Sequence, residues 1–581
     1  MQLKQNQRTG KLVKGHKMDL KSKPFYLNDS DIKWVETTLA DMTEEEKIAQ
    51  LFCLITYTDD ENYLKYLSGG IKVGGVMTRT MSLSEIVNTV TRLQSNAKIP
   101  MLISANLEAG LNQACYEGTR VGCQMGIAAT GDKKYATELA RIIGEEASAL
   151  GINWAFAPII DIDYNFRNPI TNTRTFGSNA ETVATFGKAY VEEVQKHGIA
   201  ASIKHFPGDG VDERDQHLLA SVNTLSTEEW DKSYGYVYRT CIDAGAKTVM
   251  VGHIMQPAYS KALNPALKDE EIMPGLIAPE LLNGLLREKL GFNGLIVTDS
   301  TTMAGMGTVM PREKAVPLTI ASGCDMFLFT KNLEEDFAFM TAGVKSGVIS
   351  KERLDEAVTR ILALKASLKL HEKNNIPNES KAREIVGSSA HKGVAREVAN
   401  KNITLVKNEK GVLPISPEKY KRVLVYKKEG AASAVGGGVA SGTCDKFIEK
   451  LKAQGFNVDI FVPDGSWEGM AKPVKEVYDK YDLIIYLVAL ATKSNQTVVR
   501  IEWAEPMGAD VPVYMLSIPT IMISLENPYH LLDAPRIKTY INTYGGADEI
   551  LDELIEKLTG KSQFTGISPV DAFCGKWDTR L

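Results

Sequence analysis

The sequence predicts an α/β protein in which a (β/α)8 TIM-type barrel is followed by a smaller α/β sandwich domain. At 581 residues the chain is too long for one hydrophobic core. Between residues 70 and 330, short β-branched apolar runs alternate with amphipathic segments of helical period. Such runs are typical of parallel strands covered by helices on both faces. Seven or eight units of this kind favour a closed barrel over an open sheet.

The strands and helices of the predicted barrel can be located from hydrophobic periodicity. The segment 136–150 repeats apolar residues at helical spacing, and the segment 279–291 begins with Pro279 and closes on Gly291, as helices often do. Trp154 and Phe156 fall inside a predicted strand, which favours a role in core packing. The candidate strands are 74–77, 100–108, 152–162, 199–206, 246–255, 294–300 and 325–330.

A second domain is indicated by a change of pattern after the barrel. The segment 366–395 is polar and resembles a linker with helical ends, and a second alternating region follows it. Its glycine-rich loop at 436–442 lacks the Lys-Ser/Thr of a P-loop, so a flexible or packing loop is favoured over a nucleotide site. The predicted strands of this domain are 422–428, 458–463, 482–490, 520–528 and 539–545, and we expect a disordered leader at 1–30, the catalytic barrel at 31–370, a linker at 371–400 and the sandwich domain at 401–581.

Composition excludes several classes of partner. The net charge of −5 and the pI near 6 argue against nucleic-acid binding. No apolar run is long enough to cross a membrane, and none follows the basic N-terminal residues as it would in a secretory signal. Seven scattered cysteines without a Cys-x-x-Cys pair indicate reduced thiols. We therefore expect a cytoplasmic protein with no nucleic-acid or membrane partner, and the sequence leaves its oligomeric state open.

Polar residues gather at the ends of the predicted strands. In a barrel these positions converge on the carboxyl-end mouth, where active sites lie. This placement predicts one polar pocket instead of scattered surface charges. The residues concerned are Asn106 and Glu108, Asp161 and Asp163, Lys204 and His205, His253, and Asp299.

The loop KHFPGDGVDERDQH, residues 204–217, carries the strongest chemical signal. Asp215 and His217 stand two positions apart, so in an extended segment their side chains point to the same side. The carboxylate can then orient the imidazole, which makes His217 a candidate general acid near neutral pH. A metal site built from His205, Asp209, Asp215 and His217 is the competing interpretation. Lys204 would repel a cation there, so we expect neither metal nor cofactor. A solvated charged loop remains a third interpretation of this segment alone.

This stretch resembles the signature of glycoside hydrolase family 3, in its β-N-acetylglucosaminidase branch. Further segments resemble that family in the same order along the chain: 157–177 with its sugar-binding Arg174, 252–258, 291–306 with Asp299 in the nucleophile segment, and 395–415 at the entry into a second domain. The matching residues of the signature are Lys204, His205, Phe206, Pro207, Gly208, Gly210, Asp215 and His217.

The resemblance implies a retaining glycosidase acting on a small carbohydrate. Asp299 would be the nucleophile, and His217, oriented by Asp215, the acid/base; without the resemblance, Asp299 is equally well read as a helix N-cap. The sugar would be terminal β-linked N-acetylglucosamine on short oligosaccharides or muropeptide fragments, as in peptidoglycan recycling. The substrate-binding residues implied are Lys204, His205 and Arg174, with Asn106, Glu108, Asp163 and His253 as further candidates.

Two departures and three alternatives accompany this interpretation. Asp209 stands where the branch usually has histidine, and Asn106 where it has a carboxylate that grips sugar hydroxyls. A neutral imidazole does not repel an anionic acceptor, so a phosphorylase using phosphate is one alternative. β-Glucosidases and β-xylosidases of the family are another, although they generally lack the Asp-x-His loop. A catalytically inactive sugar-binding protein would be expected to lack Asp299 or His217, and both are present.

Overall fold

The computed structural model describes residues 18–373, 375–409, 411–430, 442–467, 471, 473–492 and 494–581. Residues 1–17 of the predicted leader and residues 436–441 of the glycine-rich loop lie outside this range. The chain divides into two compact units, and each is considered by itself. The first comprises residues up to 120, 136–162 and 180–391; the second comprises 121–135, 163–179 and 392–581.

The first unit is built on eight parallel strands. Their order is β10-β1-β2-β3-β4-β5-β7-β9, and a parallel bridge between Val297 and Met326 brings the last strand back to the first. The predicted fold class is therefore confirmed, and β1, which the sequence prediction omitted, supplies the eighth strand. The strands are β1 Phe52–Thr56, β2 Gly75–Thr78, β3 Leu102–Ala105, β4 Trp154–Ala155, β5 Ala200–Phe206, β7 Thr248–Val251, β9 Leu295–Thr298 and β10 Phe327–Leu328.

Bulky side chains fill the barrel. Trp154 and Phe156 are buried, as predicted, and their rings meet edge to face with centroids 4.8 Å apart. The indole N–H of Trp154 donates a hydrogen bond of 2.9 Å to Thr248 Oγ1, so the one polar atom of this ring is satisfied inside the core. A filled interior leaves the strand ends as the place for chemistry.

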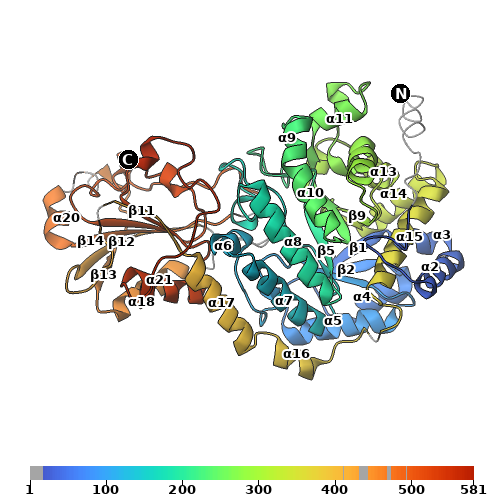
Figure 1. Cartoon of the computed structure of the whole chain (residues 1–581), viewed down its shortest axis with the longest axis horizontal. Coiled ribbons are helices and arrows are strands. Elements are labelled where there is room, and N and C mark those ends of the chain that lie inside the picture. The colour runs from blue at the N-terminus through green and yellow to red at the C-terminus, as the bar shows by residue number, and fades with distance from the viewer. Residues whose placement is uncertain are drawn as a thin grey trace. The chain divides into compact units, whose positions relative to one another are not determined.

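Helices surround the strands, as the ribbons of α5, α7, α8 and α10 show in Figure 1. The helix predicted from Pro279 to Gly291 is present as η6. The helices are α2 Asp29–Asp41, α3 Glu44–Gln50, α4 Glu61–Lys65, η1 Tyr66–Ile71, α5 Leu83–Asn96, η2 Leu111–Gln113, α7 Lys134–Ala149, α8 Ala180–Lys196, α9 Thr227–Lys232, α10 Tyr234–Asp243, α11 Pro257–Leu263, η4 Asp269–Glu271, η5 Gly275–Ile277, η6 Glu280–Lys289, α12 Ala304–Gly307, α13 Arg312–Ser322, α14 Leu333–Lys345, α15 Lys351–Ser367, α16 Glu379–Ile385 and α17 Ser389–Asn402.

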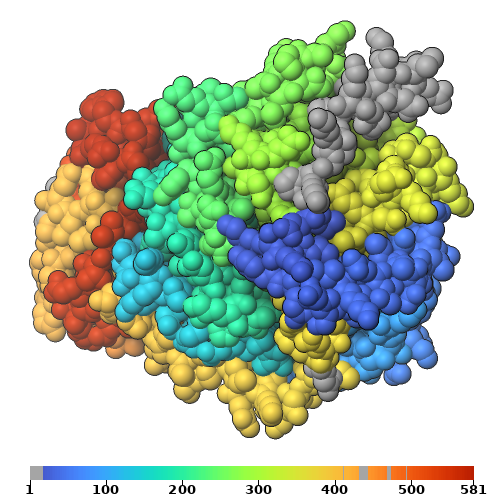
Figure 2. All heavy atoms as spheres, turned by 45° about the vertical axis from the view of Figure 1, so that its right-hand side comes forward, coloured from blue at the N-terminus to red at the C-terminus, as the bar shows by residue number. Residues whose placement is uncertain are grey.

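The beginning and the end of the barrel region are joined by ion pairs. Lys47 Nζ of α3 lies 2.6 Å from Asp355 of α15, and Lys369 binds the buried carboxylate of Asp31 in α2 at 2.6 Å. Figure 2 shows the blue N-terminal helices beside the yellow segment that contains α15. These contacts join the helices at the start of the barrel region to those at its end.

The second unit contains a six-stranded mixed sheet of order β11-β16-β15-β14-β12-β13, in which only β11 is antiparallel to its neighbour. Alternate residues of β12 and β14 face two separate hydrophobic cores, one of which includes α18 and α21. Both faces are therefore covered, as in the predicted sandwich (Figure 1). The elements are β11 Thr404–Asn408, β12 Arg422–Glu429, β13 Asn457–Ile460, β14 Leu483–Ala489, β15 Thr520–Ser524, β16 Thr539–Asn542, α6 Gln124–Ala129, η3 Asn172–Arg174, α18 Thr443–Ala453, α20 Val474–Lys480, η7 Pro506–Gly508, η8 His530–Leu532, α21 Asp548–Leu558 and η9 Asp578–Arg580.

The seven cysteines are free thiols in the structure, and six of them are buried. Burial raises the pKa of Cys53 to about 12, which keeps this thiol protonated and unreactive. Six of the seven cysteines are thus buried, as predicted.

A buried histidine clamps the first turn of α17 to α7. His391 Nδ1 donates to Glu146 Oε1 at 2.8 Å, and its Nε2 donates to Glu145 Oε2 at 2.9 Å. Because both ring nitrogens act as donors, the arrangement requires an imidazolium. The hydrogen bond to Glu146 and then that to Glu145 outweigh burial, and together they raise the pKa of His391.

This clamp predicts a pH-dependent contribution to stability. A raised pKa means that the contribution is fully present below about pH 6.5, the ordinary histidine value, and is lost as the pH rises through the higher value of the folded protein. We expect His391→Gln to lower the free energy of unfolding by about 1–3 kcal/mol at pH 6 and by much less at pH 9. Denaturant unfolding at both pH values measures this, with His197→Gln as the control. An equal loss at both pH values would contradict the imidazolium assignment.

Candidate active site

The predicted strand-end residues of the first unit come together at the carboxyl end of the barrel. Lys204 and His205 lie near the end of β5, and Asp299 follows β9 directly. Glu108 and the half-buried Asn106 follow β3. These side chains come from separate strands, and the barrel brings them to one mouth.

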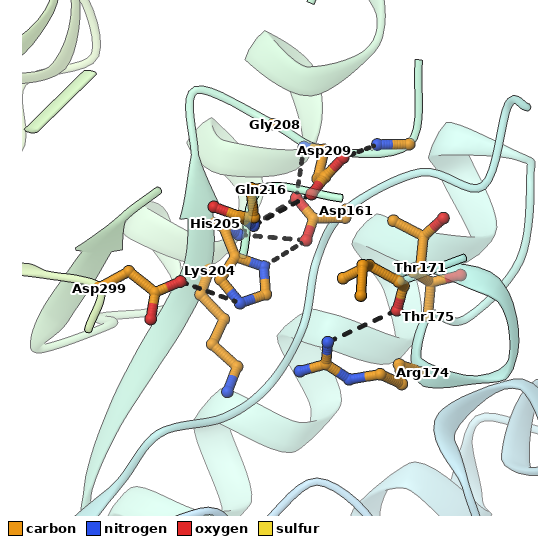
Figure 3. Close-up of polar contacts among 12 residues, drawn as sticks. Asp161, Thr171, Arg174, Thr175, Lys204, His205, Gly208, Asp209, Gln216 and Asp299 are labelled. Carbon is orange, nitrogen blue, oxygen red and sulfur yellow. Dashed lines mark hydrogen bonds and ion pairs between the residues drawn. The ribbon is translucent and has the colours of Figure 1, made fainter. Parts of the chain in front are cut away.

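His205 bridges two carboxylates. Its Nδ1 donates to Asp161 Oδ2 at 2.7 Å, and its Nε2 lies 3.8 Å from Asp299 Oδ2 (Figure 3). Asp161 also accepts the backbone N–H of His205 at 3.1 Å, which fixes the imidazole relative to the strand. The sequence placed Asp161 at a strand end but gave it no role, so this orienting carboxylate is a functional residue that the motif did not identify.

The electrostatic surroundings keep Asp299 ionised. Burial would raise its pKa, but the charges of His205, His253 and His217, together with the N–H of Ser300, lower it below the ordinary aspartate value. The Ser300 N–H donates to Asp299 Oδ1 at 2.7 Å. A carboxylate that stays charged and remains 16% exposed can act as a nucleophile toward a bound substrate.

Lys204 and Glu108 form a buried ion pair beside this centre, with Nζ and Oε1 2.8 Å apart. The N–H groups of Glu108 and Ala109 both donate to Gln113 Oε1 at 2.7 Å, which fixes the start of the loop after β3. Without a ligand, the two opposite charges neutralise each other, which makes their burial tolerable. With a polyhydroxyl ligand bound, the same pair offers it a hydrogen-bond donor and an acceptor.

Asp215 and His217 make the predicted contact. His217 Nδ1 donates to Asp215 Oδ1 at 2.7 Å, and the same oxygen accepts the His217 backbone N–H at 2.8 Å. The Asp215 side chain is fully buried, whereas the His217 side chain is 25% exposed. Because the carboxylate holds Nδ1, proton exchange with a substrate falls to Nε2.

The loop that carries this pair is anchored on both sides. The short strand β6, Ser221–Val222, pairs with β8, Ile254–Met255, after the loop. The N–H of Ala304, in the segment after Asp299, donates to the carbonyl of His217 at 3.0 Å. The acid/base candidate is therefore attached to the segment that carries the nucleophile candidate.

His253 lies behind these groups. Its side chain is completely buried, and Nε2 donates to the carbonyl of Ser300 at 2.9 Å. Burial lowers the pKa of His253 and so favours the neutral form of the ring, while the nearby Asp299 acts in the opposite direction. These contacts fit a residue that supports the backbone beside Asp299; the predicted contact of His253 with sugar remains a prediction.

Asp163 and Arg174 belong to the second unit. The Asp163 carboxylate accepts hydrogen bonds from Thr171 Oγ1 at 2.6 Å, from the Asn172 N–H at 3.0 Å and from the Tyr529 hydroxyl. Burial raises the pKa of Asp163. Its oxygens are thus engaged by the framework of their own unit, and the sugar-binding roles of Asp163 and Arg174 remain predictions.

One group of side chains in the described residues has the spacing of a cation site. It consists of Asp31, His371 and Glu372, at the N-terminal helix and remote from Asp299 in sequence. Lys369 already binds both oxygens of Asp31, at 2.6 and 2.7 Å, so its ammonium group takes the place that a metal cation would need.

Every helix in the described residues is too short or too polar to span a bilayer.

Comparisons with known proteins agree with this geometry. The glycosyl hydrolase family 3 N-terminal domain model matches residues 43–364, so the chain belongs to glycoside hydrolase family 3. It is 60% identical to a beta-N-acetylglucosaminidase/beta-glucosidase of Cellulomonas fimi, over 97% of this chain and 100% of that protein. Among solved structures, it resembles the beta-glucoside phosphorylase BglX, with a TM-score of 0.90 and 42% identity over 97% of this chain and 99% of that one. A family 3 beta-N-acetylglucosaminidase from Paenibacillus sp. has a TM-score of 0.77 and 25% identity over 92% of this chain and 100% of that one.

The charge of His205 predicts where activity is lost at low pH. Because a lowered pKa keeps Asp299 charged as the pH falls, we expect the acid limb assigned to Asp299 to lie below the ordinary aspartate pKa. His205→Gln removes the largest of the opposing positive charges, so we expect that limb to move to higher pH. The pH profile of kcat/KM with an aryl β-glycoside measures the shift, and His371→Gln is the control. An unmoved limb would exclude His205 as its cause.

Proposed function

We propose that this protein is a retaining β-N-acetylglucosaminidase that removes terminal β-linked N-acetylglucosamine from short oligosaccharides, including muropeptide fragments. The observation that carries the proposal is the presence, at one barrel mouth, of Asp299 with a lowered pKa and of a partly exposed His217 that Asp215 holds through Nδ1. A nucleophile and a proton donor of this kind are the two groups that a double displacement requires.

In the first displacement, an Asp299 oxygen attacks the anomeric carbon while the bond to the leaving oxygen breaks. His217 Nε2 gives its proton to that oxygen, and Asp215 stabilises the imidazolium before the transfer. In the second displacement, the neutral imidazole takes a proton from the acceptor, the acceptor attacks the same carbon, and the carboxylate of Asp299 is released. Two inversions give net retention.

The polar groups around the nucleophile suit a sugar. Lys204 with Glu108, and His205 with Asp161, supply charged donors and acceptors at a fixed spacing. Hydrogen bonds to such charged groups are about twice as strong as neutral ones, which suits recognition of hydroxyls in water. Arg174 is the proposed partner of the N-acetyl group through its motif, and Asn106 is proposed to contact a hydroxyl through its amide.

Phosphorolysis is the second candidate. After protonating the leaving group, His217 is neutral, so it does not repel a phosphate anion as a glutamate would. The likeness to a structure named as a beta-glucoside phosphorylase, at 42% identity over nearly the whole chain, independently favours this acceptor. The relatives' names also differ between N-acetylglucosamine and glucose, so the sugar and the acceptor are separate questions.

The nucleophile assignment predicts a large kinetic loss. We expect Asp299→Ala to reduce kcat for 4-nitrophenyl N-acetyl-β-glucosaminide by at least about 10³-fold, because no covalent intermediate can form. The wild type should cleave this substrate faster than the plain glucoside, and NMR should show the β-anomer as first product. Asp31→Asn, which changes a buried carboxylate of an N-terminal helix, should leave the rate within a few-fold. Equal rates for Asp299→Ala and wild type would overturn the assignment.

The acceptor molecule in the second displacement determines which product forms. If water is the acceptor, the free sugar is the main product in both phosphate and non-phosphate buffers. If phosphate is the acceptor, the sugar 1-phosphate dominates in phosphate buffer, and the overall rate rises with phosphate concentration when deglycosylation is limiting. Product analysis by NMR in matched buffers distinguishes the two, and a dominant sugar 1-phosphate would replace hydrolysis with phosphorolysis.

A further inference from the structure

Gln216 stands between the two residues of the acid/base pair but faces away from them. Residues 215–219 form a turn, in which the Asp215 carbonyl accepts the N–H groups of Leu218 and Leu219 at 3.0 and 3.1 Å. In this turn the side chains of Asp215 and His217 bind each other, whereas the side chain of Gln216 binds other residues. Gln216 is completely buried. Its Oε1 accepts the backbone N–H of His253 at 2.9 Å, and its Nε2 donates to Asp209 Oδ2 at 3.0 Å.

Asp209 continues this chain of hydrogen bonds to another strand end. Its Oδ1 accepts the N–H of Gly210 at 2.7 Å, and its own N–H donates to Asp161 Oδ1 at 2.8 Å (Figure 3). The residue is 2% exposed. The loop is thus connected to the segment that follows β4 through Asp209, and to the segment that follows β7 through Gln216.

The direction of each hydrogen bond is determined by the backbone. The His253 N–H can only donate, so Gln216 must present Oε1 to it and Nε2 to position 209. The Gly210 N–H is also a donor, so position 209 must accept at both of its polar atoms. A carboxylate meets this requirement, whereas the histidine common at this position in the β-N-acetylglucosaminidase branch has only two ring nitrogens of a different geometry.

We propose that Asp209 and Gln216 are positioning residues that lock the acid/base loop, so that His217 Nε2 is held where it can protonate the leaving oxygen. The proposal rests on the proposed function, because it assumes that His217 is the acid. The lock acts through Asp215 and His217, the immediate neighbours of Gln216, and neither locking residue touches the substrate. Proton transfer depends on heavy-atom distances of about 2.6–3.2 Å, so a small displacement of the loop is enough to weaken it.

A purely structural role would predict a different result. If these hydrogen bonds only stabilise the fold, their loss lowers activity equally for every substrate in proportion to the folded fraction. A lock on the acid instead makes the loss depend on the leaving group. A 4-nitrophenolate leaves without protonation, whereas the sugar alkoxide of a disaccharide needs the acid.

Exchanging the two functional groups tests the lock directly. In Asp209→Asn, the new amide N–H group faces another donor, either Gln216 Nε2 or the Gly210 N–H. In Gln216→Glu, two carboxylates face each other and repel. In the double variant Asp209→Asn/Gln216→Glu, the carboxylate introduced at position 216 accepts from the His253 N–H and from the amide introduced at position 209. The oxygen of that amide still accepts from the Gly210 N–H. The swap keeps the total charge and restores every hydrogen bond in this chain.

The measured quantity is kcat/KM for a 4-nitrophenyl glycoside and for the corresponding disaccharide. For each single variant we expect a loss on the disaccharide that exceeds the loss on the aryl glycoside by roughly 10- to 100-fold, within the range of general acid catalysis. The double variant should recover most of this difference. His217→Ala gives the reference pattern, and both sugars, N-acetylglucosamine and glucose, are assayed so that a wrong substrate assignment leaves the comparison intact.

Gln195→Glu is the matched control. Gln195, in the same barrel, bonds to backbone groups alone among the described residues: it accepts from the N–H groups of Lys247 at 3.1 Å and Ala201 at 3.4 Å, and it donates to the Gly245 carbonyl at 2.9 Å, at the amino ends of the strands. It should lower stability without dependence on the leaving group. If the loss of kcat/KM in His217→Ala does not depend on the leaving group, the acid assignment and the lock both fail. If His217→Ala shows this dependence but the single variants do not, or the swap fails to remove it in a folded protein, the lock alone is overturned.

Discussion

The carboxylate of Asp161 is the contact on which the catalytic end of the barrel depends. It is 1% exposed, and a buried charge of this kind is stable only when donors surround it. Those donors are the backbone and Nδ1 of His205 and the N–H of Asp209. One residue therefore sets the orientation of the imidazole beside Asp299 and the starting point of the loop that carries the proposed acid.

The three histidines near Asp299 differ in function because their surroundings differ. His205 is held between two carboxylates, whereas His253 is fully buried and burial favours its neutral form. His217 is the most accessible of the three, with Nδ1 engaged by Asp215 and Nε2 as the atom proposed to exchange protons. One residue type thus supplies charge and backbone support and, in the proposed mechanism, proton transfer.

The sequence predicted the fold class well because buried parallel strands leave long apolar runs. β1 was omitted since its run, LFCLIT, directly follows a helix and lies outside the clear alternation. At the site, the predicted contact between Asp215 and His217 is present, but it forms in a turn at residues 215–219 and not in the extended segment that the prediction assumed. Asp161 and Asp163 were indistinguishable by spacing, and only the fold shows that Asp161 binds His205 while Asp163 binds residues of the second unit. His391 looked isolated because its partners, Glu145 and Glu146, are about 245 residues away.

The turn that begins at Asp215 has a consequence for engineering this loop, because Asp215 accepts the backbone N–H groups of His217, Leu218 and Leu219. Asp212, in the stretch before the turn, accepts the Val222 N–H of β6 at 2.8 Å, so the two arms of the loop are tied to each other. An insertion inside the triplet 215–217 would separate Asp215 from the backbone donors of the turn and from His217 Nδ1. The triplet is also incomplete by itself, because its central glutamine needs an acceptor at position 209. A graft of this acid/base segment into a related barrel must therefore carry two separated pieces of sequence, Asp209 and Asp215 to His217, as one functional module.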